Sequence, residues 1–370
     1  MAIISKILKM KKILFYLLIG GTFITQSCIN DNDDPIVVPK TDGFTVDAKV
    51  GGATQPNQVW FDFGTNSMVS TKRGDWDLAF YSGNEFKVIL NSSVAMAAAK
   101  VPNATDIKQV TAASVATLTS QVVVGPYSAA NIKYIDDVKG NIPSGYTAIE
   151  EVKANASENG IYLVNMGVKV FTGNVAAGSV NTGSESRGWM KIQVLRQGNG
   201  YKVRYAPLDE TTNIKELNVT KNSAYNYSFV SLVNNNDVVI QPEKKNWDIG
   251  FTVFTNVIEG MGTYVYADFI TINNMGGAGA YEVNAAGTVT GTEAYNNFKL
   301  SDIDQSKFVY NDQRVIGGNW REAGPSGSQV KSNVFYVIKD AEGYYFKLRF
   351  KNMTDEKGER GHPQFEYKPL

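Results

Sequence analysis

Residues able to bind a metal or attack a substrate are scarce in this sequence of 370 residues. It contains one cysteine, Cys28, and one histidine, His362. A single cysteine excludes an internal disulfide, and a single histidine excludes a metal or haem site built from two histidines of one chain. Neither a nucleophile elbow nor a P-loop nor a dinucleotide-binding fingerprint is present. We therefore predict that the protein is not an enzyme, and we assign no catalytic or metal-binding residue.

Methionines are the remaining candidates for ligating a haem iron, because a thioether sulfur can occupy an axial position. Met96, Met261 and Met275 lie in glycine- and alanine-rich segments, which favours exposure, and Met166 is considered with them. The alternative is that these side chains fill gaps in a hydrophobic core, which is the more frequent role of methionine.

A second set of candidate binding residues combines aromatic rings with a cation. Trp320 and Arg321 are adjacent, and Tyr310 precedes them by a short segment. Such a surface would suit a porphyrin or a sugar. The alternative is ordinary packing at the rim of a domain.

The elements that position these residues are strands, and they occur in two copies. The segment GDWDLAF at 74–80 returns as KNWDIGF at 245–251. Before each copy stand an alternating aromatic strand and a polar turn, with the strands at 59–63 and 225–230. A repeat of this length indicates a duplicated structural unit. We predict an all-β protein made of two tandem, sandwich-like antiparallel β domains.

Each copy of the repeat contains a Trp-Asp pair that invites a functional interpretation. Because Trp76 and Trp247 occupy equivalent strands, we interpret them as shared core anchors rather than as the walls of a pocket. We expect Asp77 and Asp248 to accept hydrogen bonds from backbone donors near a turn. Acid–base catalysis would need two carboxylates in one cleft, so a hydrolase is the weakest functional hypothesis.

Strong alternation around short turns predicts further hairpins, at 188–205 and 333–350, and a closing strand at 364–367. The glycines of 257–262 predict a flexible loop. We place the two domains at 44–212 and 213–370.

The composition agrees with a globular β protein. Apolar residues make up 43%, and the 34 glycines favour strands and turns. Lysine plus arginine and aspartate plus glutamate are equal at 36 each, so the bulk charge predicts no nucleic-acid binding.

The N-terminus has the pattern of a bacterial lipoprotein signal. Two lysines precede an apolar run at 13–24, and Ser27 precedes Cys28. This predicts a signal peptide at 1–27, starting at Met1 or Met10, and lipidation of Cys28. A cleaved signal with an incidental thiol is the alternative. The acidic segment that follows predicts a solvated tether over 28–43.

In this order, these pieces resemble the HmuY family of Bacteroidetes surface lipoproteins. The resemblance rests on the Trp-Asp strands, the hairpin ending YYFKLRF, the closing aromatic strand and the lipobox-like segment. It implies a cell-surface protein, lipid-anchored in the outer membrane, that captures haem and passes it to an outer-membrane receptor of the TonB-dependent class.

The resemblance also implies two axial ligands, histidines or methionines, but neither carries over. Ala323 occupies the position of the second ligand, in the loop at 317–325. The region of the first ligand, 284–310, contains no histidine or methionine, and His362 aligns with neither position. Two hypotheses follow: capture of haem or a related tetrapyrrole, or a changed ligand such as a glycan, a peptide or an outer-membrane partner.

Overall fold

The computed structural model describes residues 43–125, 128–287, 289–324 and 327–370. Residues Thr41–Leu370 belong to one compact unit. The predicted signal peptide, Cys28 and nearly all of the predicted tether lie outside the described residues. Within the described ranges, no helix is both long and apolar enough to cross a membrane.

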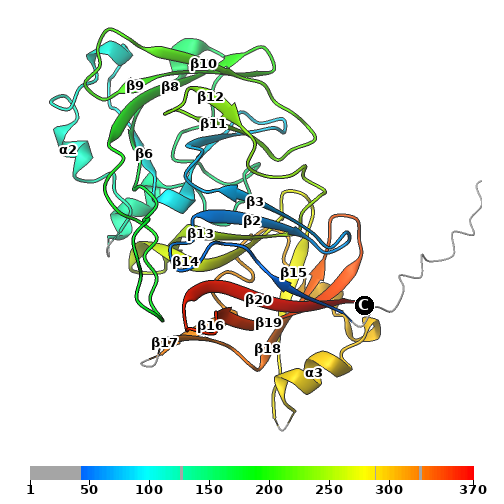
Figure 1. Cartoon of the computed structure of the whole chain (residues 1–370). Coiled ribbons are helices and arrows are strands. Elements are labelled where there is room, and N and C mark those ends of the chain that lie inside the picture. The colour runs from blue at the N-terminus through cyan, green and yellow to red at the C-terminus, as the bar shows by residue number, and fades with distance from the viewer. Residues whose placement is uncertain (1–42, 126–127, 288, 325–326) are drawn as a thin grey trace, which may run out of the picture. The chain divides into compact units, whose positions relative to one another are not determined.

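Antiparallel strands dominate this unit, as the sequence predicts (Figure 1). Two five-stranded sheets have matching topology. The first has the order β10 (Lys215–Val219), β9 (Gly200–Pro207), β8 (Trp189–Gln197), β7 (Ile161–Asn165) and β6 (Ala97–Lys100). The second has the order β1 (Phe44–Asp47), β20 (Arg360–Pro369), β19 (Tyr345–Thr354), β18 (Val334–Lys339) and β15 (Gly279–Asn284).

Two four-stranded sheets combine strands from both repeats. One has the order β12 (Asn236–Val238), β11 (Tyr227–Ser231), β4 (Leu78–Tyr81) and β5 (Val88–Leu90). The other has the order β14 (Gly262–Ile272), β13 (Ile249–Ile258), β2 (Asn57–Asp62) and β3 (Ser67–Lys72). The remaining strands, β16 (Arg321–Gly324) and β17 (Gly327–Val330), form a small hairpin.

Among the described residues, helical structure is confined to short segments. The α-helices are α2 (Ala116–Thr119) and α3 (Gly291–Asn297). The 3-10 helices are η1 (Ser92–Val94), η2 (Ile107–Gln109), η3 (Ala129–Tyr134), η4 (Ala156–Glu158), η5 (Leu300–Asp302) and η6 (Gln305–Lys307).

The two repeats exchange their aromatic hairpins. The first hairpin, β2–β3, pairs with the second Trp-Asp strand, β13, through Phe61 opposite Ile249. The second hairpin, β11–β12, pairs with the first Trp-Asp strand, β4, through Phe229 opposite Ala79. Figure 1 shows β2 and β3 beside β13 and β14, although they are far apart in the sequence.

The exchange defines two modules that differ from consecutive halves of the chain. Module A contains β4–β12, and module B contains β1–β3 together with β13–β20. Even the first described strand, β1, pairs with the last, β20. The boundary between residues 212 and 213 stays a prediction about the repeats, since the hydrogen-bonded sheets run across it.

By place in its sheet, the β8–β9 hairpin corresponds to β19–β20. The other predicted hairpin, at 333–350, is β18–β19, which corresponds to β7–β8 instead. The two predicted hairpins are therefore not copies of each other, because an alternating pattern carries no information on position in the sheet.

Each module is a two-sheet sandwich whose core mixes the repeats. In β2, Val59 and Phe61 enter the module B core while the intervening Trp60 faces the other way. In β11, Val230 enters the module A core while Phe229 faces the other way. Successive strand residues point to opposite faces, so both faces of each exchanged strand are buried.

The outward residues of the exchanged strands meet in an aromatic seam between the modules. The seam consists of Trp60, Trp76, Ala79, Ile142, Tyr227, Phe229, Ile240 and Trp247. Trp76 contacts Phe229 edge-on at 5.0 Å between ring centroids, and Trp247 contacts Trp60 in the same way at 4.8 Å. The prediction that the two tryptophans are equivalent core anchors is confirmed.

The two aspartates of the repeat also perform the predicted role. Asp77 Oδ2 accepts a hydrogen bond from the Leu232 backbone N–H at 2.7 Å, and Asp248 Oδ2 accepts one from Phe63 N–H at 2.9 Å. Leu232 and Phe63 follow the exchanged strands β11 and β2. Each aspartate therefore fixes the hairpin supplied by the other repeat.

Candidate ligand-binding surface

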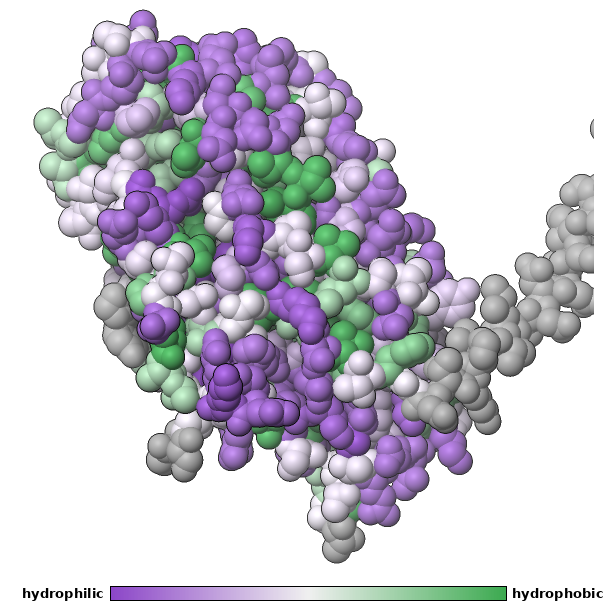
Figure 2. Space-filling view, viewed as in Figure 1, coloured by the Kyte–Doolittle hydropathy of each residue, from purple (hydrophilic) through white to green (hydrophobic). Residues whose placement is uncertain are grey.

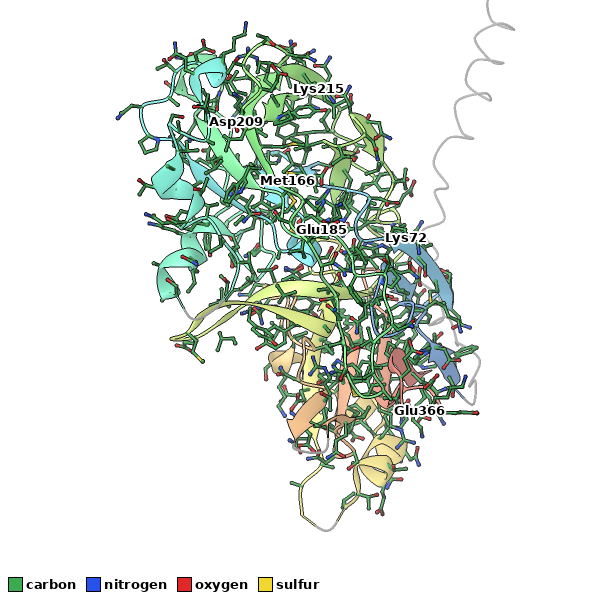
Figure 3. The ribbon with its side chains drawn as sticks, turned by 60° about the vertical axis from the view of Figure 1, so that its left-hand side comes forward. Lys72, Met166, Glu185, Asp209, Lys215 and Glu366 are labelled. Atoms are coloured by element: carbon green, nitrogen blue, oxygen red, sulfur yellow. The ribbon has the colours of Figure 1, made fainter. Side chains whose placement is uncertain are left out.

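Two of the four candidate methionines are core residues. Met96 and Met166 are each 1% exposed and pack in the module A core. Figure 3 shows Met166 among the strands of module A. Met275 is half-buried against the seam. Met261, 43% exposed in the turn between β13 and β14, is the candidate most accessible to a ligand.

The aromatic and cationic candidates separate in the structure. Trp320 is fully buried, donates its Nε1–H to the Asp268 carbonyl at 3.1 Å and packs on Phe350. Tyr310 is exposed and stacks on Phe308. Among the described residues, no hydrogen bond, ion pair or ring contact joins Tyr310 to Trp320.

The β13–β14 hairpin replaces the flexible loop predicted at 257–262, and that prediction was wrong. The ladder continues to Ile258 opposite Gly262. Alternating β-branched and aromatic residues extend both strands, and this pattern prevails over the glycines, of which Gly260 lies in the turn and Gly262 begins β14. The Gly125 N–H donates to Thr263 Oγ1 at 3.1 Å, which ties the hairpin to module A.

Two tyrosines on this hairpin were missed by the sequence analysis. Tyr264 is 49% exposed, and Tyr266 is half-buried beside it with ring centroids 5.0 Å apart. Their spacing of two places them on one face of β14, and this was the available signal. We call Met261, Tyr264, Tyr266 and Arg321 the Tyr264 surface.

Arg321 brings a cation to this surface. It begins β16, in the loop at 317–325, and its Nη2 donates to the Ala267 carbonyl of β14 at 2.7 Å. The adjacent bridge between Ile270 and Gly317 fixes the same loop against β14. The loop for which the family resemblance implies an iron ligand therefore lies along the strand that carries Tyr264.

Positive charge exceeds negative charge beneath the Tyr264 surface. Asp268 pairs with Arg360 and also accepts a hydrogen bond from Gln55. Burial lowers the pKa of Arg321, and Asp268 opposes this effect. Asp268 forms an ion pair with Arg360 and acts on Arg321 only through its charge, and the Nε atoms of both arginines are buried without a partner among the described residues. Such a site is complementary to a ligand that bears carboxylates.

Outside these groups, hydrophilic and hydrophobic residues are intermixed on the face shown in Figure 2, where hydrophilic residues predominate. Single exposed apolar residues are normal on such a surface. We therefore base the candidate site on the combination of phenol, thioether and guanidinium groups.

Comparison with known proteins identifies the family. The family model of the HmuY protein matches residues 54–223 and 222–367. A crystal structure of an HmuY-like heme binding protein from Bacteroides vulgatus ATCC 8482 is similar at 14% identity, over 42% of this chain and 79% of that one, with a TM-score of 0.21. No curated protein matches the chain. The two family matches cover most of the sequence, and the chain belongs to the HmuY family as a tandem, two-copy member.

Proposed function

We propose that this protein is a non-enzymatic binding protein that captures haem or a related tetrapyrrole at the Tyr264 surface. The observation that carries the proposal is the contact between Arg321, in the loop of the family's second ligand, and the strand that bears the exposed Tyr264. Haem is a planar aromatic group with an iron centre and two carboxylates, and the surface offers a complement to each part.

The available donors fit this group. A phenolate oxygen and a thioether sulfur are both known axial ligands of haem iron. Tyr264 and Met261 are the residues that would hold the iron, and Arg321 would pair with a propionate. The bound group would supply the iron; the chain would supply orientation and charge.

The protein's place in the cell completes the proposal. Acylation of Cys28 would anchor the chain in the outer membrane at the cell surface, with residues 28–43 as a tether. Captured haem would pass to a TonB-dependent receptor for uptake. Labelling of wild-type and Cys28→Ser cells with a fatty acid tests the anchor, since only the wild-type chain would carry the label.

A changed ligand is the second candidate function. Exposed tyrosine rings also stack on sugars, and Ala323 at the second ligand position supplies no donor side chain. A glycan, peptide or outer-membrane partner would use the same surface without iron.

Titration of the mature chain with haemin tests the proposal. We expect a shifted Soret band that saturates at one equivalent. Tyr264→Phe keeps the ring and removes the oxygen, so it should change the spectrum and weaken binding at least tenfold. Tyr310→Phe, at another exposed tyrosine, is the matched control. Unchanged haemin binding in Tyr264→Phe and Met261→Ala would exclude this surface as the binding site. The absence of any spectral change at micromolar haemin would exclude haem as the ligand.

A further inference from the structure

The only histidine of the chain lies beside two carboxylates at the end of the β19–β20 hairpin. Asp355 directly follows β19, Glu359 directly precedes β20, and His362 lies near the start of β20. Each of these side chains offers one potential ligand atom, and the three atoms lie within 4.8 Å of one another. We call these residues the His362 cluster. The proposed haem site does not use it.

The turn holds both carboxylates in place and leaves part of each free. Asp355 Oδ1 accepts hydrogen bonds from the Lys357 N–H at 2.9 Å and the Glu359 N–H at 2.8 Å. Glu359 Oε1 accepts one from the Ala53 N–H at 3.2 Å. Among the described residues, no hydrogen bond involves the second oxygen of either carboxylate or a ring nitrogen of His362. Each side chain therefore keeps an electron pair that can bind a metal.

Two glycines bring the cluster against the segment that precedes β2. The Gly52 N–H donates to the Gly361 carbonyl at 3.3 Å, and Gly361 has a φ of +84° within a bulge of β20. A Cβ at Gly52 would collide with Glu359 Oε1 and would lie 3.9 Å from His362 Nε2. A side chain at residue 52 would therefore enter the space next to both groups, and glycine leaves this space open.

The two carboxylates of the cluster are not neutralised by a direct contact within the described part of the chain. Neither Asp355 nor Glu359 forms an ion pair there with a lysine, an arginine or His362. Two carboxylates this close repel each other unless a cation stands near them. The imidazole does not contact either oxygen directly, so the donors leave a gap that an ion can fill.

The cluster opens into a groove that has room for an ion together with water. The volume of the groove is about 640 Å³, and Lys49, Asn57 and Gln364 are among its other lining residues. A water molecule takes about 30 Å³ of liquid volume. An ion bound to the cluster can therefore keep water on the positions that the protein does not fill.

We propose that Asp355, Glu359 and His362 bind one divalent transition-metal ion, for which zinc is the best match. Zinc takes imidazole nitrogen and carboxylate oxygen at about 2.0–2.2 Å, and three side chains and a water often complete its tetrahedron. Donor atoms in such a tetrahedron lie about 3.4 Å apart, so the exposed side chains of Glu359 and His362 close on the ion by small rotations. Calcium and magnesium prefer oxygen ligands, so the imidazole favours zinc over both.

Zinc chloride is the probe, titrated by calorimetry into the metal-free mature chain. This chain carries no histidine tag and has Cys28→Ser, because a free thiol also binds zinc. We expect saturation at one equivalent with a Kd of about 10 µM or tighter, and at least tenfold weaker binding of calcium. His362→Ala and Glu359→Gln each remove one ligand and should weaken zinc binding at least tenfold.

Glu356→Gln is the matched control. It removes the same charge as Glu359→Gln from an exposed residue of the same turn, outside the cluster, and should bind zinc as wild type does. Nuclear magnetic resonance adds a direct readout, because the ring proton signals of His362 are the only ones of their kind and should shift when zinc binds. Tyr264→Phe should bind zinc normally, which separates this site from the proposed haem site.

Several results would overturn the proposal. They are the absence of zinc binding up to about 0.1 mM, unchanged affinity in both His362→Ala and Glu359→Gln, an equal loss in Glu356→Gln, or unshifted His362 signals. Loss of haemin binding in His362→Ala would assign the histidine to the haem site and would also overturn it. Circular dichroism of each variant establishes that it is folded, and if one ligand variant fails to fold, the other decides the outcome.

Discussion

The equivalent aspartates of the two repeats should respond in opposite ways to the same substitution. Asp77 is buried against Arg187, whose Nη2 lies 2.6 Å from Asp77 Oδ1. Asp248 is 3% exposed, and its charged neighbours are the carboxylates of Asp340 and Asp62. We predict that Asp77→Asn destabilises the protein and that Asp248→Asn stabilises it at neutral pH.

The size of the Asp248 effect follows from its ionisation. Burial, together with the two nearby carboxylates, raises the pKa of Asp248 to about 8, although the Phe63 N–H favours the charged form. In the unfolded chain this group ionises near pH 4. Between these values the native state binds more protons than the unfolded state, so stability falls as pH rises, by up to about 1.4 kcal/mol per pH unit. From pH 4 to pH 7 this amounts to about 4 kcal/mol.

An asparagine at 248 keeps an oxygen acceptor for Phe63 N–H and removes the ionisation. At pH 7 Asp248→Asn should therefore raise the free energy of unfolding by about 2–4 kcal/mol and flatten its pH dependence. Asp77→Asn should lower the free energy of unfolding by about 3 kcal/mol, because it leaves the largely buried Arg187 without its anion.

Urea denaturation of wild type and both variants from pH 5 to pH 8 is the assay. The mature chain suits it, because the residues that make these contacts all lie in the described part of the chain. If Asp248→Asn loses as much stability as Asp77→Asn at pH 7, or if its advantage does not grow with pH, the reasoning is refuted.

Three further predictions concern the seam and its supports. Trp76→Phe should be less stable than Trp247→Phe by about 1–2 kcal/mol in urea denaturation, because only the former leaves a bonded acceptor unsatisfied; equal losses would contradict the assignment of partners. Arg73 is fully buried and donates hydrogen bonds to backbone carbonyls of separate segments. Arg73→Met should therefore lower the free energy of unfolding by at least about 3 kcal/mol, and Arg73→Lys should recover less than half of this loss in the same assay. Cysteines replacing Tyr81 and Tyr227, which face each other across the exchanged pair of strands, should form a disulfide in the folded monomer, detected by mass spectrometry; repeats that keep their own hairpins would leave both thiols free.

The sequence was sufficient to predict the all-β fold and the duplication, because both depend on local patterns. Alternation over β8–β9 and β18–β19 predicted those hairpins, and both are present. The roles of the Trp-Asp pairs followed from their equivalence. These features need no knowledge of which strand lies next to which.

The exchange of hairpins was outside the reach of such patterns. The β2 strand has the same alternation whether it pairs with β4 or with β13. One signal of the exchange was available in β2. Val59 and Phe61 make one face of this strand apolar and Trp60 makes the other face apolar, which indicates burial on both sides. Choosing between the partners requires tertiary contacts that one sequence does not contain.

The candidate site was predicted only in part. Arg321 contacts β14, the strand that carries Tyr264, and Met261 lies in the turn before this strand, whereas Met96 and Trp320 are core residues. Composition around Met96 suggested a loop, but short alanine-rich segments also pack closely in a core, as β6 does here. The sequence analysis did not select Tyr264, because the glycines near residue 260 predicted a loop in place of the β13–β14 hairpin.

The central claim is that this HmuY-family protein binds a tetrapyrrole where β14 meets the start of β16. Hydrogen–deuterium exchange with and without one equivalent of haemin tests that location directly. The account predicts that haemin slows exchange in peptides covering 258–267 and 317–324 and leaves the strands of the first repeat unchanged. Protection confined to 284–310, or no protection anywhere, would contradict it.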